Sequence, residues 1–195
     1  MAYTSCASQL GANIAQDCAH PLVGGYTGEM LLIDLSDVTL TPTISGSNPR
    51  ILTNIALAAG DKVAVVDNAW GTPFDGSTTE VATDNGAPKY TKTLGFRVPK
   101  RGAGASKDIV EAFYNNPAGF LAIIPKNDKV GDGSFEVIGY QKPLKGSAGS
   151  RNENEQDGSV SITLTTQEAW FEVVLFDTDY ATTKAIYDSL KALAY

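Results

Sequence analysis

The chain has 195 residues, of which 43% are hydrophobic and 19% are charged. That length suits a single domain with or without extended arms, and the hydrophobic content is enough for a core, which argues against wholesale disorder. Fifteen basic residues against 22 acidic ones give a net charge of -7. A protein that grips nucleic acid through clustered Lys and Arg is therefore disfavoured.

Membrane and secretory proteins are also disfavoured. No apolar run approaches the roughly 20 residues that a membrane-spanning helix needs, and the longest runs, 30–35 and 120–124, have the length of strands. Residues 1–10 contain neither the basic nor the apolar part of a secretory signal. Two cysteines, Cys6 and Cys18, are too few for a disulfide framework, so synthesis in a reducing cytoplasm is expected.

Residues 1–28 are rich in Gly, Ala and small polar residues and keep no helical or strand period. We predict an extended N-terminal arm there, followed by a single β-rich domain at 29–195. Residues 29–35 are apolar almost throughout, which predicts a strand. In 38–44 apolar residues alternate with threonines as in a half-buried strand, and Pro42 favours an edge position or a bulge.

Two further strands are predicted at 50–57 and 62–67, and the turn residues between them, 59–61, favour a hairpin. The long polar stretch 71–88 contains two glycine turn signals and is predicted as a loop. Loops of that length in a compact domain tend to be functional or disordered.

The second half of the chain is better patterned. Residues 90–98 predict an amphipathic strand that carries Lys92 on the same face as Leu94. Ser106 is expected to cap the N-terminus of a short helix, because its hydroxyl can accept a hydrogen bond from an otherwise unpaired amide. A buried strand at 120–124 follows.

Further strands are predicted at 135–140, at 160–165, where the alternation is cleanest, and at 169–176. The polar segment 142–158 is predicted as a loop. Residues 178–195 carry apolar side chains at helical spacing, which predicts a C-terminal helix. Mostly strands, with one inserted helix and one C-terminal helix, indicate an α+β fold around a sandwich or barrel-like core.

Candidate catalytic and metal-binding residues are few. His20 is the only histidine, and no nucleophile elbow or activated serine accompanies it, so a loop histidine is the simpler interpretation. Cys6, Cys18 and His20 could supply three zinc ligands. Structural zinc needs four ligands and favours paired short spacings such as C-x-x-C, which are absent. We assign no catalytic residue, no metal and no cofactor.

Three polar segments resemble binding motifs only in part. Residues 101–107 lie between a strand and a helix, where phosphate-binding loops occur, but their order does not match G-x-x-x-x-G-K-[ST]. Residues 127–133 lack the alternating ligands and the closing Glu of an EF-hand, so a tight turn is favoured. Acidic residues within 153–157 lie in a polar loop, where solvated charge is the usual explanation. We therefore predict that the protein is not an enzyme.

From residue 89 onward the order of elements resembles that of phage tail tube subunits. A strand ends in TLGFRVPK, a helix follows in SKDIVEAFYNNPAG, a buried strand in FLAIIPK, and a hairpin leads to GSFEVIGYQKPLKG; a polar loop then precedes GSVSITLTTQEAWFEVVLF. The N-terminal sequence QDCAHPLVGGYTGEMLLIDLSDV is similar to the openings of virion proteins of phages that infect Bacteroidetes.

This resemblance implies a structural subunit whose sheets join around a sixfold ring, and rings that stack head to tail into a tube through which DNA passes. The N-terminal arm and the segments 71–88 and 142–158 would contact neighbouring subunits, and an acidic lumen would let DNA slide. The implied partners are further copies of the chain and the tail terminator, baseplate and tape-measure proteins, with no membrane. The implied location is the virion tail, after assembly in the host cytoplasm.

Two other interpretations stay open. A head-tail connector, a tail terminator or a secretion-system tube protein would share the fold. A β-sandwich module that binds carbohydrate would stack aromatic rings on sugars, with Trp70, Trp170 and Tyr90 as candidates. Trp170 lies in an apolar run and is expected in the core.

Overall fold

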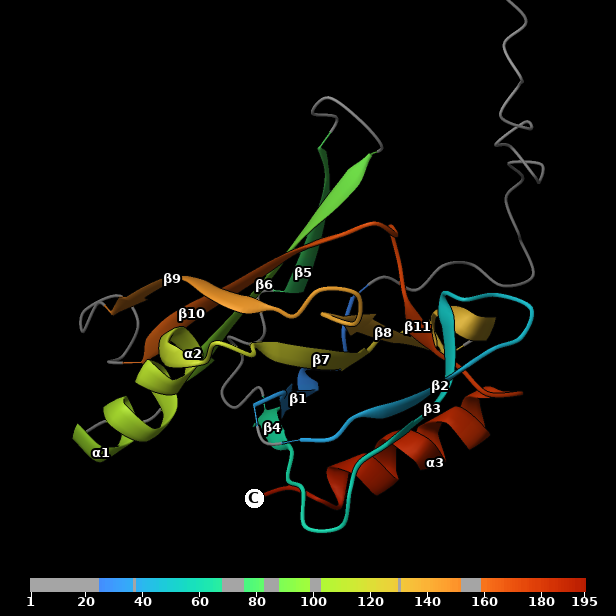
Figure 1. Ribbon diagram of the computed structural model, residues 1–195, viewed down its shortest axis with the longest axis horizontal. Helices are drawn as coiled ribbons and strands as arrows, with labels where there is room; N and C mark the ends of the chain where they lie inside the picture. The colour runs from blue at the N-terminus through green and yellow to red at the C-terminus, as the bar shows by residue number, and fades with distance from the viewer. Residues whose placement is uncertain are drawn as a thin grey trace, which may run out of the picture.

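The computed structural model of the chain describes residues 25–36, 38–67, 76–82, 88–98, 103–129, 131–151 and 159–195. These residues form two β-sheets, of seven and four strands, that pack against each other without closing into a barrel. A helix is inserted between two strands, and a second helix, α3 (Tyr180–Lys191), lies on the outer face of the larger sheet (Figure 1). The predicted mainly β sandwich with two helices is confirmed.

The seven-stranded sheet has the order β2-β3-β11-β8-β7-β1-β4. Its central strands β1 and β7 are buried along nearly their whole length, because layers cover both faces. That is why their sequences are apolar almost throughout rather than alternating. The strands are β1 (Glu29–Asp34), β2 (Thr41–Ile44), β3 (Ile51–Ala56), β4 (Ala64–Asp67), β7 (Phe120–Pro125), β8 (Phe135–Ile138) and β11 (Val174–Leu175).

The four-stranded sheet has the order β5-β6-β10-β9, and every neighbouring pair is antiparallel. In its two central strands buried residues alternate with partly exposed ones, as the sequence predicts for sheets with one covered face. Lys92 is buried on the same face as Leu94, which confirms that prediction. The strands are β5 (Gly76–Ala82), β6 (Lys89–Val98), β9 (Lys145–Arg151) and β10 (Val160–Glu168).

The core has two parts, one on each face of the larger sheet. Between the sheets, Leu94 and Ile162 belong to the same cluster as Met30 and Ile124. On the other face, Leu31 packs with residues of α3, including Tyr187 and Leu190. The molecule is therefore a stack of three layers: the four-stranded sheet, the seven-stranded sheet and α3.

The inserted helix consists of α1 (Ala103–Ala105), the π-helical turn η2 (Ser106–Glu111) and α2 (Ala112–Asn115). The prediction that Ser106 caps this helix is wrong, because helical structure already begins at Ala103. Phe113 anchors the helix between the rings of Phe96 and Phe120, with centroid separations of 5.3 and 5.2 Å. The helix thereby closes the end of the space between the two sheets.

Pro42 lies in the edge strand β2, and the pairing of β2 with β3 shifts register between Thr43 and Ile44. Both the edge position and the irregularity predicted from this proline are confirmed. Proline is tolerated there because an edge strand does not need every N–H for pairing.

The predicted hairpin through residues 59–61 is wrong. Strand β3 pairs with β2 and β11, whereas β4 lies at the far edge of the same sheet beside β1. Buried Val63, just before β4, forms a bridge with Ala194 near the C-terminus. Pairing with distant strands, which local turn residues cannot indicate, decides where each strand lies.

Two predicted loops contain strands. Strand β5 lies within 71–88 and β9 within 142–158, and both are polar edge strands held by pairing with β6 and β10. Conversely, the strand predicted at 169–176 is reduced to Val174–Leu175, because 169–171 form a bend. Of the arm predicted at 1–28, only residues 25–28 are among those described.

Candidate functional site

The residues weighed for chemistry are only partly within the described structure. His20, Cys6 and Cys18 lie outside the described residues, as do Trp70 and residues 153–157. Among the described residues, no three His, Cys, Asp or Glu side chains form a group that could hold a metal ion. The described helices include none that is both long and apolar enough to cross a membrane.

The turn predicted at 127–133 joins the antiparallel strands β7 and β8 and ends in a short 3₁₀ helix, Gly131–Ser134. Of the segment 101–107, the described residues are already helical from Ala103 onward.

The four outer strands of the two sheets differ in what they offer to another chain. Strand β2 contains Pro42, which has no N–H to donate. Just before β4, the N–H of Val63 donates to Leu193 O at 3.2 Å, and the N–H of Tyr195 donates to Val63 O at 3.3 Å, so the C-terminal segment lies against the beginning of this edge. Strands β5 and β9 have seven residues each and contain no proline. Among the described residues they are the outermost strands of the four-stranded sheet, and no further described strand pairs with either of them.

Strand β5 is fastened to the larger sheet by a polar network. The hydroxyl of Tyr26 is 2.5 Å from Ser77 Oγ and donates to Glu136 Oε2 at 3.1 Å. Burial and the neighbouring Glu136 carboxylate raise the pKa of Tyr26. Lys126 Nζ lies 3.5 Å from Glu136 Oε2 and 2.5 Å from Glu172 Oε1; burial alone would lower the pKa of Lys126, but these two carboxylates raise it. Ser77 Oγ also donates to Glu136 Oε2 at 3.4 Å, so the network holds an edge strand in place through three hydrogen-bonded side chains.

Strand β9 is supported by the inserted helix. Tyr114 Oη donates to Ala148 O at 2.8 Å. A Cβ at Gly149 would lie 2.0 Å from Tyr114 Oη. At Gly146 a Cβ would lie 2.7 Å from the backbone oxygen of Phe113. The two glycines therefore let the helix approach β9 closely. Their presence explains why β9 lacks the apolar alternation that identifies a strand in sequence.

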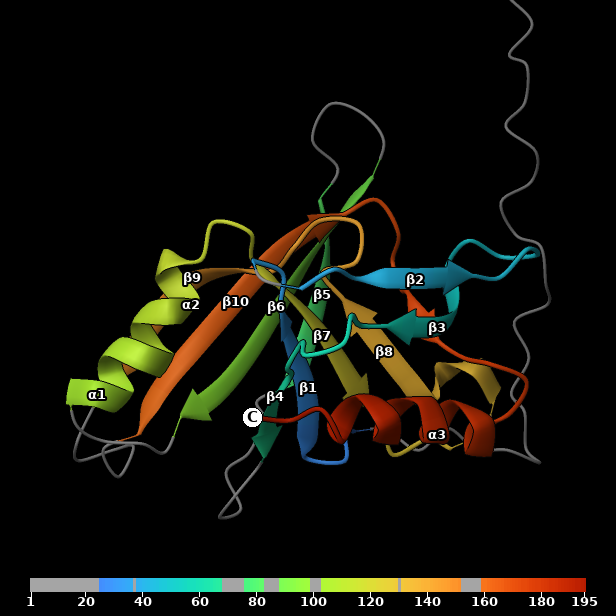
Figure 2. The same ribbon diagram turned by 60° about the horizontal axis from the view of Figure 1, so that its bottom comes forward.

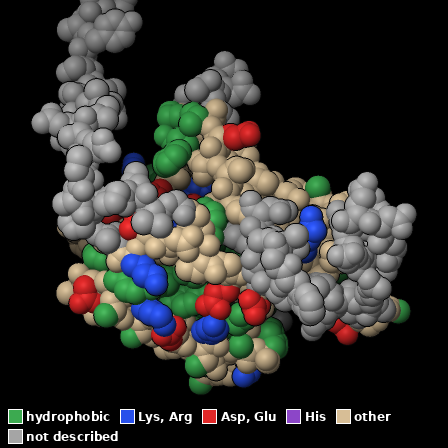
Figure 3. Space-filling view, turned by 180° about the vertical axis from the view of Figure 1, so that it is seen from behind, with side chains coloured by type: hydrophobic (Ala, Val, Ile, Leu, Met, Phe, Trp, Pro, Cys, Tyr) green, Lys and Arg blue, Asp and Glu red, His purple; other side chains and the backbone are tan. Residues whose placement is uncertain are grey.

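The outer face of the four-stranded sheet consists mainly of hydroxyl side chains. Thr78, Thr93 and Thr165 are aligned across β5, β6 and β10, and Lys145 of β9 continues the row. In the view from behind, charged side chains of both signs gather over the lower part of the molecule, and fewer lie on the upper part that is not drawn in grey (Figure 3). By strand alternation the same face also presents Thr91, Ser161, Thr163 and Gln167, together with the charged residues Glu80, Lys89, Arg97 and Lys145.

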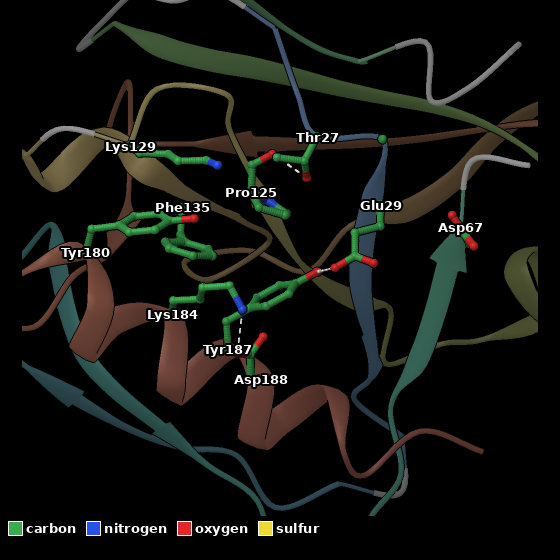
Figure 4. Close-up of a pocket in the computed structure, with 11 residues that line it drawn as sticks. Thr27, Glu29, Asp67, Pro125, Lys129, Phe135, Tyr180, Lys184, Tyr187 and Asp188 are labelled. Atoms are coloured by element: carbon green, nitrogen blue, oxygen red, sulfur yellow. Dashed lines mark hydrogen bonds and ion pairs between the residues drawn. The ribbon is translucent and has the colours of Figure 1, made fainter.

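A pocket of about 340 Å³ lies between α3 and the ends of β1, β4 and β7. Residues of α3 project toward Thr27, Pro125 and Glu29 in Figure 4. Tyr187 Oη donates to Glu29 Oε1 at 3.3 Å. The pKa of Tyr187 is raised, mainly because the side chain is buried and also because the Glu29 carboxylate is close. Phe135, Tyr180 and Tyr187 supply aromatic surface, and Lys129, Lys184, Asp67, Glu29 and Asp188 supply charge. We call this cavity the α3 pocket.

An exposed apolar cluster lies at the far end of the β5–β6 hairpin. Val81 is 56% exposed and pairs with Tyr90 across the two strands. Phe171 is 52% exposed and meets the Tyr90 ring edge to face at a centroid separation of 5.5 Å. We call these three residues the hairpin patch. Trp170, weighed for sugar stacking, is partly buried against the core on the α3 side rather than joining this patch.

The chain matches no family model, no curated protein and no solved structure. Its function is therefore inferred from its own edges, faces and pockets.

Proposed function

We propose that the protein is a structural subunit that assembles into rings and tubes, as phage tail tube proteins do, by joining β9 of one copy to β5 of the next. The observation that carries this proposal is that the two outermost described strands of one four-stranded sheet are both seven residues long and free of proline. A strand at the edge of a sheet is a template to which another strand can add.

The direction of the strands supports a ring. Because the four strands alternate in direction, β5 and β9 run in opposite directions. When a second copy is placed beside the first with its outer face on the same side, its β5 runs antiparallel to the first copy's β9. Repeated joining keeps the outer face of every sheet on the same side. Such a heterologous contact closes into a ring when the rotation from one copy to the next is a whole fraction of a full turn.

The charges at the two edges also favour joining. Lys145 on β9 and Glu80 on β5 both lie on the outer face of the sheet. In a joined pair these opposite charges would lie near the same boundary, whereas a β5–β5 contact would bring the two copies of Glu80 together. Cross-strand pairs of opposite charge stabilise a sheet by a few tenths of a kcal/mol and like charges destabilise it.

In this assembly the outer face of the four-stranded sheet forms the wall of the lumen. The sequence-based expectation of an acidic lumen stays a prediction. The described part of this face carries three basic residues, Lys89, Arg97 and Lys145, and one acidic residue, Glu80. Threonine and serine hydroxyls between them offer DNA only dispersed, uncharged contacts, which suits a chain that must slide. Passage of DNA would then depend on low charge density rather than on repulsion.

Disulfide cross-linking tests the joining of β5 to β9. We suggest the substitutions Lys145→Cys with Thr78→Cys, and Lys145→Cys with Glu80→Cys, in a chain whose Cys6 and Cys18 are replaced by serine. Within one copy β5 and β9 are three strand spacings apart, roughly 14 Å, which is beyond the reach of a disulfide. Every disulfide must therefore join two copies.

The expected result is a ladder of covalent multimers that ends at the ring number, from particles that negative-stain microscopy shows as rings or tubes. The control pair, Thr43→Cys on β2 with Lys145→Cys, should give no ladder. A protein that stays monomeric at all concentrations, or assemblies in which neither test pair cross-links, would refute the proposal. Rings that never stack would indicate a connector or terminator instead.

A further inference from the structure

We propose that rings stack by insertion of the hairpin patch of one copy into the α3 pocket of a copy in the next ring. This inference rests on the proposed tube function and specifies its axial contact. The partner is a second copy of this chain.

The hairpin patch is placed to reach a neighbour. Strands β5 and β6 project beyond the other described strands and helices in both ribbon views (Figure 2). Two of its three side chains are more than half accessible, Val81 at 56% and Phe171 at 52%, and Tyr90 is partly buried between them. Apolar side chains of this size are stabilised when they are removed from water, so a partner that covers them gains free energy. A projecting apolar cluster on a chain rich in polar surface is a typical contact site.

Along β5 the α3 pocket lies toward the end opposite Val81, because its lining residue Thr27 follows Tyr26, whose hydroxyl contacts Ser77 near the start of the strand. In both ribbon views α3 is on the opposite side from the projecting end of the hairpin. Copies stacked in one orientation would therefore present the hairpin patch of one to the α3 pocket of the next. Such a contact joins two different surfaces, so a stack of copies still presents a hairpin patch at one end and an α3 pocket at the other. Further copies can therefore add at both ends, and the stack grows instead of closing.

The chemistry of the two surfaces matches. The pocket of about 340 Å³ has Phe135, Tyr180 and Tyr187 among its lining residues, which gives aromatic surface for an incoming valine or aromatic ring. The residues next to the patch carry one charge of each sign, Glu80 and Lys89. The pocket likewise carries both signs, with Lys129 and Lys184 against Asp67, Glu29 and Asp188. Charges around an apolar centre fix the orientation of a contact more than they add affinity.

Two variants test the inference. In the first, Val81→Asp with Phe171→Ser places a charge in the patch and removes its largest exposed ring. We expect rings still to form but the equilibrium constant for stacking two rings to fall by about tenfold or more, so that the tubes become clearly shorter at the same protein concentration. The matched control is Ile44→Asp on β2, which also charges an exposed apolar residue, 46% accessible, and should leave tube length unchanged.

The second variant joins Val81→Cys with Lys129→Cys in the chain that lacks Cys6 and Cys18. Oxidised tubes should contain disulfides between rings, and isolated rings should contain none. Tubes of normal length from the first variant, or oxidised tubes without inter-ring disulfides, would overturn the stacking inference while leaving ring formation intact. Wild-type rings that never stack would do the same. If no rings form, the proposed function and this inference both fail.

Discussion

Lys92 Nζ lies 2.8 Å from Glu168 Oε2, and neither side chain has any exposed surface. Lys92 belongs to β6 and Glu168 ends β10, so the ion pair connects two adjacent strands of the four-stranded sheet on their covered face. The other carboxylate oxygen of Glu168 accepts from the N–H groups of Gly139 and Gln141 at 3.1 and 3.2 Å. Those amides follow β8, so the pair also fastens the four-stranded sheet to the seven-stranded one.

Removing one partner of this pair should be strongly destabilising. Lys92→Met leaves the Glu168 carboxylate buried without its counter-ion, and losses of about 3–5 kcal/mol are typical of such changes. Urea unfolding of the free subunit measures the loss. The double variant Lys92→Met with Glu168→Gln should recover much of it, since the amide oxygen can still accept from the two N–H groups. If the loss of unfolding free energy in the double variant equals the sum of the losses in the two single variants, the ion pair does not have the proposed stabilising role.

Gly139 should tolerate no side chain. It has a φ of 93°, and a Cβ there would lie 2.5 Å from Phe120 O, which belongs to a buried strand that cannot move aside. Gly139→Ala should therefore cost more than the roughly 1 kcal/mol of an alanine forced into positive φ. Gly60 is the matched control, with a φ of 100° and open space around it. Equal melting temperatures for Gly139→Ala and Gly60→Ala would contradict the prediction.

Asp179 should stabilise α3 in a pH-dependent way. Its side chain accepts from the Thr182 N–H at 2.7 Å, and this hydrogen bond lowers the pKa of the carboxyl. The stabilisation is therefore present above the ordinary aspartate pKa and is lost as the pH falls through the lower pKa of the folded state. Asp179→Ala should lower the melting temperature at neutral pH, and the difference from wild type should shrink as the pH falls from the ordinary aspartate pKa toward the lower pKa of the folded state. Asp179→Asn should keep most of the cap, and a pH-independent difference for the alanine variant would refute the prediction.

Tyr26→Phe should loosen β5 specifically. The variant loses the hydroxyl that contacts Ser77 and Glu136, and a part-buried hydrogen bond contributes about 1 kcal/mol. Hydrogen exchange should become faster at the amides of β5 and stay unchanged in α3. Tyr195→Phe serves as the control, because Tyr195 is 89% exposed. Uniform acceleration over the chain would indicate general destabilisation rather than a role in holding β5.

Where hydrophobic alternation is strong, the sequence predicts the fold well. Strands β6 and β10 have one covered face, so their patterns in 90–98 and 160–165 identify them directly. Strands β5 and β9 carry no such pattern, since their positions depend on pairing with β6 and β10. Sequence reasoning therefore assigned the two proposed assembly edges to loops. The alternation of Ser77, Thr79 and Val81 is the only local signal of β5, and the two glycines that accommodate the helix remove any such signal from β9.

The polar contacts that organise the candidate surfaces were less predictable. In the network of Tyr26, Ser77 and Glu136, Tyr26 is 51 positions from Ser77 in the chain, and Ser77 is 59 positions from Glu136. The α3 pocket similarly brings Glu29 beside Tyr187, 158 positions away. No local period relates such residues, because their proximity follows from the order of strands in the sheets. The edge position of Pro42 was predictable, because the missing N–H is a property of the residue itself.

The even number of strands in the smaller sheet has a consequence for symmetry. If β5 were deleted, three strands would remain, and the two outermost, β6 and β9, would run in the same direction. Antiparallel joining of β6 to β9 would then require every second copy to be inverted. Joining of β6 to β6, or of β9 to β9, would place a twofold axis between two copies. Such a truncated chain would favour closed pairs over rings. In the proposed assembly, the even number of described strands in this sheet would thus favour a polar polymer over a dimer.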